Sequence, residues 1–524
     1  MPAVTQSTYC LPDDAHLMIH PGMPPTWGWA ILVGVCLIAG YALLAKPPAT
    51  RPARFWPLQR LPLLGPLQTF LTASPWPLVV LRLITTAVLL LVMAAGLWGV
   101  PWPERNFATT FTWILWWTLV ILSVFWLGSA WCAICPWDAL AVWLNRRHWW
   151  RRGETDHGLG WRLPAPLRTV WPALVLLIGL TWLELGVGLP ANPEATALLA
   201  LLMVVLTTTS QALFERKSFC RYACPIGRTI GFYAQLAPLE LRPVQPDRCR
   251  SCTTLECYHG SQEMEPCPTF LTMGRLTQNT YCLSCGACLL SCPEHNIAWR
   301  LRPMATEAAV GARPHWDEAW FMVLLLALTT FHGLTMLPAW EASQCAMIPF
   351  LSTLVGNRGG WLLAFSLGMG VCLVVPVLLY TLAVAVTHRL AGTRLPFRRV
   401  FALCSFAVLP VAFAYHLAHN LSHLVRESAG ISQVMLNPFG SGTLPMTAME
   451  QQWRMMTLLI PESWLYVCQG GLFLLGYGLA VAIVRQRIGV LGRQRRILLP
   501  LLLFLGGCTG LNLWLVVQNM VMRL

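Results

Sequence analysis

The stretch YCLSCGACLLSCP, residues 281–293, places four cysteines within eleven residues and a proline directly after the last of them. These cysteines are Cys282, Cys285, Cys288 and Cys292. The spacing Cys-x2-Cys-x2-Cys-x3-Cys-Pro is typical of bacterial iron–sulfur motifs, in which three cysteines bind one [4Fe–4S] cluster and the fourth binds another. The stretch therefore predicts a second cysteine motif in the chain.

A second, looser motif lies upstream and also ends in Cys-Pro. Its cysteines are Cys249, Cys252, Cys257 and Cys267. Crossed pairing would put one [4Fe–4S] cluster on Cys267, Cys282, Cys285 and Cys288, and the other on Cys249, Cys252, Cys257 and Cys292. The alternatives are a zinc site, which would take four cysteines, or buried thiols. Eight cysteines in two Cys-Pro-terminated sets favour two clusters.

The composition places this motif in an unusual setting. The chain has 524 residues, of which 56% are hydrophobic and 11% are charged. Such a composition indicates a polytopic membrane protein in contact with lipid. The net charge of +14 comes from basic residues grouped between apolar runs, which is the positive-inside pattern of membrane proteins rather than a nucleic-acid-binding surface.

Ten apolar runs are long enough to span a bilayer. They lie at about 26–45, 78–100, 109–128, 170–189, 195–214, 318–338, 361–387, 400–424, 462–484 and 497–520. Basic residues follow every second run, as in the loops after residues 128, 214 and 387. This alternation predicts a bacterial inner-membrane protein whose cysteine segment is cytoplasmic and whose two termini are periplasmic.

The first half of the membrane region contains an internal repeat. Two helical hairpins run into the segments FWLGSAWCAICPWDAL and FERKSFCRYACPIGRTI. Each segment holds a cysteine pair before a proline, Cys132 and Cys135 in the first and Cys220 and Cys224 in the second. A pseudo-twofold arrangement of four helices would bring the pairs together. They could then hold a third metal centre, or they could be structural.

Two hairpins that each end in a Cys-Pro motif, followed by a two-motif cysteine segment, resemble the membrane polyferredoxins NapH, NosR and CcoG over about residues 78–300. The resemblance implies electron transfer at the cytoplasmic membrane, often from quinol, in respiratory or copper-enzyme systems. This chain differs in the two-residue spacing of its first cysteine pair, in lacking a large periplasmic flavin-binding domain, and in having a five-helix C-terminal half.

The C-terminal half contains the stretch FAYHLAHNLSHLVRE, in which His416, His419 and His423 share one helix face. Polar residues inside a membrane helix usually have a partner. We place His332, on the run at 318–338, at a similar depth in the outer half of the membrane. Histidines at matched depth on two helices predict a bis-histidine haem b. Copper binding and hydrogen-bonded helix packing are the alternatives, and the ligand among the three is left open.

These observations predict an all-α polytopic membrane protein with an inserted cytoplasmic ferredoxin-like α+β segment. We expect four units: an N-terminal segment at 1–77, a four-helix core at 78–240, the cysteine segment at 241–317 and a five-helix domain at 318–524. Glu184 could contact a quinone or pass protons, or it could be a boundary carboxylate. On the outer side, Cys10 and Cys345 could form a disulfide.

The predicted function is electron relay between quinone, the cytoplasmic clusters, the outer-half haem and a periplasmic redox protein or membrane metalloenzyme. Two other functions stay open. The protein could be a maturation factor that reduces copper or iron for another membrane metalloenzyme, or it could be a redox sensor.

Overall fold

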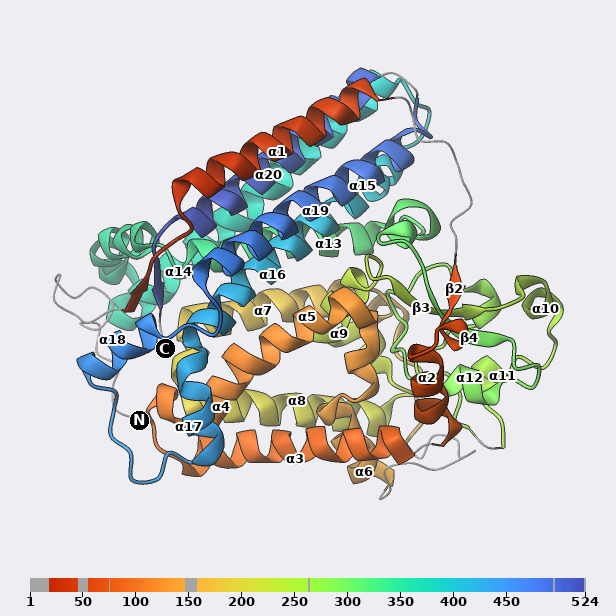
Figure 1. Ribbon diagram of the computed structural model, residues 1–524, viewed down its shortest axis with the longest axis horizontal. Coiled ribbons are helices and arrows are strands. Elements are labelled where there is room, and N and C mark those ends of the chain that lie inside the picture. The colour runs from red at the N-terminus through yellow and green to blue at the C-terminus, as the bar shows by residue number, and fades with distance from the viewer. Residues whose placement is uncertain are drawn as a thin grey trace.

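The computed structural model describes residues 18–45, 55–74, 76–146, 158–262, 264–492 and 495–522. It is mainly helical, and its long helices form two neighbouring groups (Figure 1). The first group contains α3 (Trp76–Trp98), α5 (Trp117–Leu127), α7 (Trp171–Val187) and α8 (Pro193–Leu213). The second contains α1 (Pro25–Leu44), α13 (Trp316–Leu334), α14 (Pro338–Ala391), α16 (Val408–Glu427), α19 (Glu462–Ile488) and α20 (Leu499–Val517).

Several helical stretches can cross a membrane. Within the described residues, eight are long and apolar enough, or nine if one bent pair counts as a single span. The eight are Pro25–Leu44, Trp76–Trp98, Phe107–Arg146, Pro193–Leu213, Gly359–Ala391, Phe397–Leu436, Glu462–Ile488 and Arg495–Val517. The chain is therefore a polytopic membrane protein, and these eight stretches overlap eight of the ten predicted runs.

The other two predicted runs take a different form. The run at 170–189 gives α7, which has only 17 residues and ends where Gly188 adopts a left-handed conformation with φ 77°, as helices often do at glycine. The run at 318–338 gives α13, which bends by 88° into the helical stretch Pro338–Gly356. Gly356, with φ 75° and ψ 166°, then separates that stretch from the long span of α14.

Shorter helical elements connect the long ones. They include α2 (Leu64–Ala73), α4 (Phe107–Thr109), η4 (Thr110–Trp116), η5 (Gly128–Ala133), α6 (Pro136–Arg146), η8 (Phe219–Ala223), α9 (Pro225–Tyr233), α10 (Pro246–Ser251), α11 (Glu256–His259), α12 (Ala287–Ser291), η10 (Glu307–Gly311), α15 (Phe397–Cys404), α17 (Ile431–Leu436) and α18 (Ala448–Met456). Of these, η4, η8 and η10 are π-helical, a form that often marks functional sites.

Two small sheets lie at opposite ends of the long helices (Figure 1). β1 (Met18–His20) pairs with β5 (Met520–Met522), which brings the two ends of the described chain together. At the other end, beside α10, α11 and α12, the strand order is β2-β4-β3. Here β4 (Ile297–Leu301) pairs antiparallel with both β3 (Leu239–Pro243) and β2 (Trp56–Pro57). The linker after α1 thus contributes a strand to the cysteine segment.

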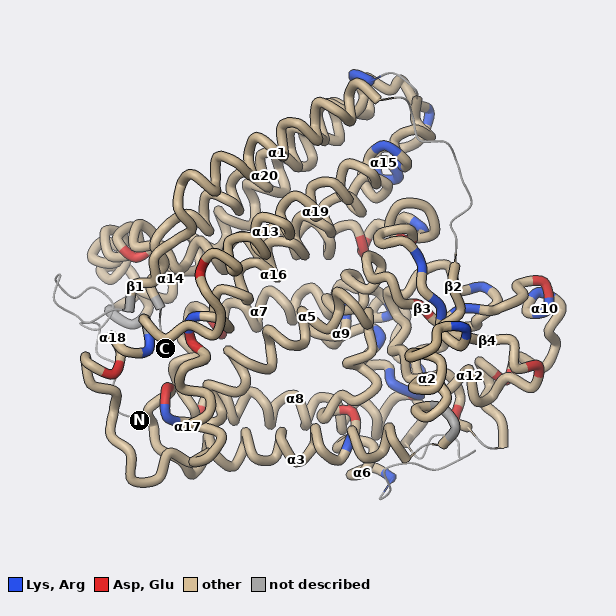
Figure 2. Tube along the Cα trace, viewed as in Figure 1, with Lys and Arg blue, Asp and Glu red and all other residues tan. Residues whose placement is uncertain are grey.

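The charges are unevenly distributed along the molecule. Lys and Arg gather near the cysteine segment and the neighbouring helix ends (Figure 2). At the end that carries α17 and α18, two arginines are paired with carboxylates: Arg105 lies 2.8 Å from Glu450, and Arg426 lies 2.9 Å from Glu462. Cys345 is disulfide-bonded, and Cys10 lies outside the described residues.

A buried ion-pair network holds the three-stranded sheet to the chain around it. Glu307, on η10, pairs with Arg242 of β3 at 3.0 Å and with Arg302. Glu240 lies 2.8 Å from the same Arg302. The carboxylate of Glu307 also accepts a hydrogen bond from the backbone N–H of Asn279, which lies three residues before Cys282. The network therefore connects the sheet directly to the cysteine motif at residues 281–293.

Candidate functional site

The loop that carries Cys282, Cys285 and Cys288 is tightly wound. Ser284 and Gly286 both adopt positive φ values, 53° and 75°, and α12 begins directly after Gly286. Burial raises the pKa of the Cys282 thiol to about 12, because a thiolate is poorly solvated there. The three thiols therefore come from one short segment with two residues in the left-handed region.

The cysteines of the segment lie close enough together to shift one another's pKa values. The pKa of Cys288 is raised well above its ordinary value by burial and then by Cys282, Cys285, Cys267 and Cys257. The pKa of Cys249 is raised by burial, lowered by a hydrogen bond from Asn296, and raised again by Cys292 and Cys252. Cys267 therefore lies near the downstream motif and Cys292 near the upstream one. Cys257 also interacts with Cys267 and Cys288, so the division of the eight cysteines between two clusters stays a prediction.

Several sulfur atoms accept hydrogen bonds from nearby N–H groups. The backbone N–H of Leu271 donates to Cys267 Sγ at 3.3 Å. The side-chain amide of Asn296 donates to Cys249 Sγ at 3.4 Å. In iron–sulfur proteins, hydrogen bonds to sulfur are one of the factors that set the reduction potential. These contacts are therefore of the kind that cluster ligands make.

The two cysteine pairs of the internal repeat also lie close together. Pro136 and Pro225 begin α6 and α9, a position where proline needs no N–H partner. The thiols of Cys132 and Cys224 are close enough to interact electrostatically. Burial, Asp138 and Cys224 raise the pKa of Cys220 well above its ordinary value, and Cys135 contributes to the same shift. The pseudo-repeat therefore places all four thiols in one group.

Polar contacts tie this four-cysteine group to its surroundings. Lys217 pairs with the buried carboxylate of Asp138. The guanidinium of Arg228 is fully buried and donates to the carbonyl oxygen of Thr280 at 2.5 Å. The hydroxyl of Ser129 donates to the carbonyl oxygen of Cys282 at 2.6 Å. The group at the membrane edge is thus joined to the downstream cysteine loop.

Among the described residues, no group of three or more His, Cys, Asp or Glu side chains converges in a way that could hold a metal ion. The ligands of a [4Fe–4S] cluster have a different geometry, because its four thiolates surround a multi-iron cluster rather than converge on one ion. The donor set is chemically suitable for clusters, since iron–sulfur centres are held by cysteine thiolates.

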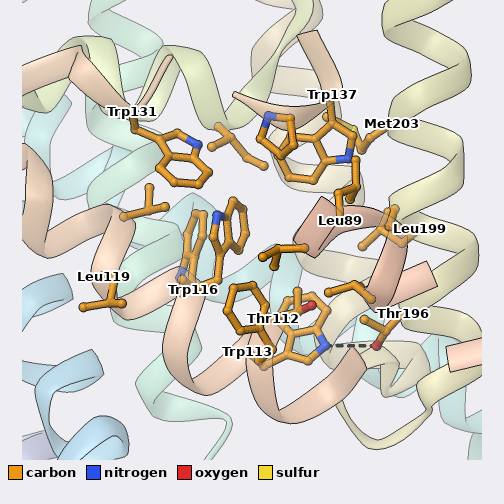
Figure 3. Close-up of a pocket in the computed structure, with 18 of the residues that line it drawn as sticks. Leu89, Thr112, Trp113, Trp116, Leu119, Trp131, Trp137, Thr196, Leu199 and Met203 are labelled. Carbon is orange, nitrogen blue, oxygen red and sulfur yellow. Dashed lines mark hydrogen bonds between the residues drawn. The ribbon is translucent and has the colours of Figure 1, made fainter. Parts of the chain in front are cut away.

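An apolar cavity of about 540 Å³ adjoins the four-cysteine group. Pro136 and Pro225, which directly follow the two cysteine pairs, both line it. Tryptophans form much of the wall (Figure 3): Trp113 and Trp116 come from η4, and Trp131 and Trp137 flank the Cys132/Cys135 pair. Trp113 Nε1 donates to Thr196 Oγ1 at 3.0 Å.

Two features of the cavity point to a ligand. The indole Nε1 atoms of Trp131 and Trp137 are buried and have no hydrogen-bond partner, which is costly for a donor unless a bound molecule accepts it. The cavity also borders the outer surface of the helices, because the lining residues Ile84 and Leu119 are 54% and 46% exposed. A lipid-soluble molecule with a carbonyl oxygen fits both features.

The predicted histidines fall into two environments. His332 Nδ1 lies 3.1 Å from His419 Nε2, and that nitrogen lies 3.2 Å from His423 Nε2. His416 points elsewhere, with Nδ1 3.3 Å from Tyr233 Oη and its ring packed against Trp117. The helices α13 and α16 are therefore close together, as expected, but only three of the four histidines are in contact with one another.

This arrangement does not fit a bis-histidine haem. The iron of such a haem lies between its two axial nitrogens, whereas the facing nitrogens of His332 and His419 are in direct contact at 3.1 Å. The cavity beside His419 and His423 has a volume of only about 20 Å³. That is room for about one water molecule and not for a porphyrin.

The small cavity brings together residues that lie far apart in the sequence. His20 of β1 lines it together with Glu427, and burial lowers the pKa of His20 to about 4. Trp131 and Trp137 were not singled out from the sequence. Three tryptophans within residues 113–117 could have drawn attention to the cavity. Tryptophan is common at membrane interfaces, however, and does not by itself indicate a cavity.

Comparison with known proteins gives two matches. A family described as a 4Fe-4S binding domain matches residues 109–153 and 196–237, which contain the Cys132/Cys135 and Cys220/Cys224 pairs. A putative electron transport protein, YccM of Escherichia coli (strain K12), is 28% identical over 129 residues, or 24% of this chain. The match spans 33% of that relative's length. No solved structure matches.

The family match indicates iron–sulfur binding in the internal repeat, and the apolar helices indicate a membrane protein. The matched segments are the two halves of the internal repeat, each with its Cys-Pro motif. The closer resemblance to the NapH, NosR and CcoG type stays a prediction.

Proposed function

We propose that this protein exchanges electrons between a membrane quinone and iron–sulfur clusters held by its twelve motif cysteines. Two [4Fe–4S] clusters would be held by the crossed sets of the cysteine segment. A third centre would be held by Cys132, Cys135, Cys220 and Cys224, which the 4Fe-4S family matches support. The clusters supply the redox chemistry, and the protein sets their position and potential.

One observation carries this proposal. The prolines that follow the two cysteine pairs, Pro136 and Pro225, line the same apolar cavity. A quinone ring in that cavity would therefore lie beside the four-cysteine group. Its carbonyl oxygen could accept a hydrogen bond from the unpartnered Nε1 of Trp131 or Trp137. Its isoprenoid tail could leave the cavity past Ile84 and Leu119 into lipid.

The distribution of basic residues supports a cytoplasmic location for the cysteine segment, by the positive-inside rule. The redox partner would then dock at this end of the molecule (Figure 2). An outer haem and a periplasmic electron acceptor are not part of this proposal, because His332 Nδ1 and His419 Nε2 lie only 3.1 Å apart.

The test uses anaerobically purified protein in lipid nanodiscs. Iron, acid-labile sulfide and haem are measured first, and decylubiquinol is then added while the clusters are followed by electron paramagnetic resonance. We expect cluster signals, no b-type absorption band, and reduction of part of the signal by the quinol. Cys285→Ser should remove the signal of one cluster, whereas Cys36→Ser, at an exposed cysteine, should not.

The cavity is tested separately. Trp131→Phe and Trp137→Phe remove a single N–H donor each and should weaken quinol-dependent reduction while dithionite reduces the clusters fully. Trp126→Phe is the matched control, because Trp126 lies on α5 with 61% of its surface exposed and does not line the cavity. Full clusters that decylubiquinol cannot reduce would refute the quinone exchange and favour the maturation factor. Detection of a b-type absorption band would instead support the prediction of a bis-histidine haem.

A further inference from the structure

We propose that Glu184, His332, His419, His423 and Glu427 form a proton path from the tryptophan-lined cavity to the end of the molecule that carries β1 and β5. This inference rests on the proposed exchange of electrons with a quinone. It adds a route for the protons that accompany those electrons.

The need for such a route follows from the chemistry. Oxidation of a quinol breaks two O–H bonds and gives a quinone, two electrons and two protons. Two clusters would take one electron each, but a proton released in an apolar cavity needs an acceptor, because an isolated buried charge is very costly. Among the described residues that line the cavity, Glu184 is the one ionisable side chain.

The path begins at this carboxylate. Glu184 is on α7, and its Oε1 lies 3.4 Å from His332 Nε2 on α13. The other ring nitrogen of His332, Nδ1, lies 3.1 Å from His419 Nε2 on α16. A proton taken up at Nε2 of His332 can therefore be given up at Nδ1, on the opposite side of the ring. His332 thus connects the cavity wall to the second group of helices.

The path continues along α16. His419 Nε2 also lies 3.2 Å from His423 Nε2, so His419 takes up and releases the proton at the same nitrogen. His423 Nδ1 lies 2.6 Å from Glu427 Oε1. His423 can therefore also receive a proton at one ring nitrogen and release it at the other. From Glu184 to Glu427, no step between two side chains is longer than 3.4 Å.

The path ends at the small cavity of about 20 Å³. Glu427, His20 and Gln518 line it, and it lies next to β1 and β5, at the end opposite the cysteine segment. Its volume matches about one water molecule. The neighbouring Arg426 is paired with Glu462 at 2.9 Å, whereas Glu427 is paired with His423. Tyr415, whose ring packs against His419 with centroids 5.7 Å apart, and His416, which interacts electrostatically with His419, are further titratable neighbours.

His416 lies on the same helix but takes no part in this path, because it faces Tyr233 and Trp117. The path therefore uses three of the four histidines that the sequence suggested for haem, and it uses them through direct nitrogen–nitrogen contacts. A metal ion or haem at these residues would interrupt those contacts.

The experiment measures electrons and protons together. Protein in nanodiscs is mixed with decylubiquinol in a stopped-flow instrument, with cluster absorbance and a pH-indicator dye followed in parallel, in water and in deuterium oxide. Glu184→Gln, His332→Gln and His423→Gln are compared with wild type. His388→Gln is the matched control, because His388 bonds the carbonyl oxygen of Leu395 at 2.9 Å and lies outside the path.

We expect the three path variants to retain the dithionite-reduced cluster signals, which shows that they fold. Their quinol-dependent reduction and proton release should both slow by at least about tenfold, since a positioned acid–base group contributes roughly 10²- to 10⁴-fold. The deuterium isotope effect should increase in the same variants and not in His388→Gln.

Two results would overturn the proposal, and they differ. If wild type reacts with decylubiquinol and all three path variants react and release protons at the same rate, the proton path is wrong and the quinone exchange stands. If wild type with full clusters does not react with decylubiquinol, the quinone exchange itself is wrong and the path fails with it.

Discussion

Replacing Glu307 by Gln tests whether the buried ion-pair network holds the cysteine segment in place. Glu307 is 3% exposed and neutralises part of the charge of Arg242 and Arg302. In the network, Glu240 and Glu307 face three arginines, since Arg300 lies 2.7 Å from Glu240. The substitution therefore leaves one carboxylate for three buried or half-buried guanidinium groups.

The magnitude follows from that imbalance. Removing one partner of a buried ion pair costs about 3–5 kcal/mol, and the amide oxygen of Gln keeps one acceptor, so we expect about 3 kcal/mol. This corresponds to a roughly 100-fold increase in the opened population of the segment. Hydrogen–deuterium exchange at the β4 amides should accelerate by that factor if β4 opens together with the network.

The control is Glu294→Gln in the same segment. Glu294 lies 3.5 Å from Arg248, but the two side chains are 64% and 56% exposed. A surface pair of this kind contributes at most about 1 kcal/mol, so that exchange at β4 should change little. Equal exchange rates in Glu307→Gln and Glu294→Gln would refute the reasoning that the buried network stabilises the segment.

Three further predictions concern other parts of the molecule. Gly231→Ala should abolish or severely reduce cluster content, because the added Cβ would lie 2.1 Å from the carbonyl oxygen of Thr280. In the control Gly40→Ala the added Cβ would have no neighbour within 4 Å, so cluster content and melting temperature should stay nearly unchanged. Normal cluster content in Gly231→Ala would contradict this packing argument. A topology reporter should be cytoplasmic after Arg394 and periplasmic after Gly440, and the opposite result would reverse the proposed orientation. Burial lowers the pKa of His20 to about 4, below its unfolded value of about 6.5, so the unfolded chain binds more protons between these values. Stability should therefore fall by up to about 3 kcal/mol as the pH decreases from about 6.5 to 4, and His20→Phe should remove that part of the fall in thermal melts; an identical pH profile would refute it.

The sequence by itself determined the features that depend on local spacing. Apolar runs of sufficient length indicated the membrane helices, since a helix that crosses lipid must satisfy its own backbone and present apolar side chains. The close cysteine spacing indicated cluster ligands, because a short loop can bring neighbouring thiols together. Helical periodicity placed His416, His419 and His423 on one face, and in the structure two of these three are in contact.

Only the tertiary structure decided how distant elements meet. Glu184 and His332 are on α7 and α13, and no local pattern relates them. The same holds for the cavity between the two halves of the repeat, for β2 in the sheet of the cysteine segment, and for the bend after α13. In the sequence, a histidine that binds haem and one that passes a proton look alike. The difference lies in the distance between the facing ring nitrogens, which must leave room for an iron ion in one case and allow direct contact in the other. That distance is set by the packing of whole helices.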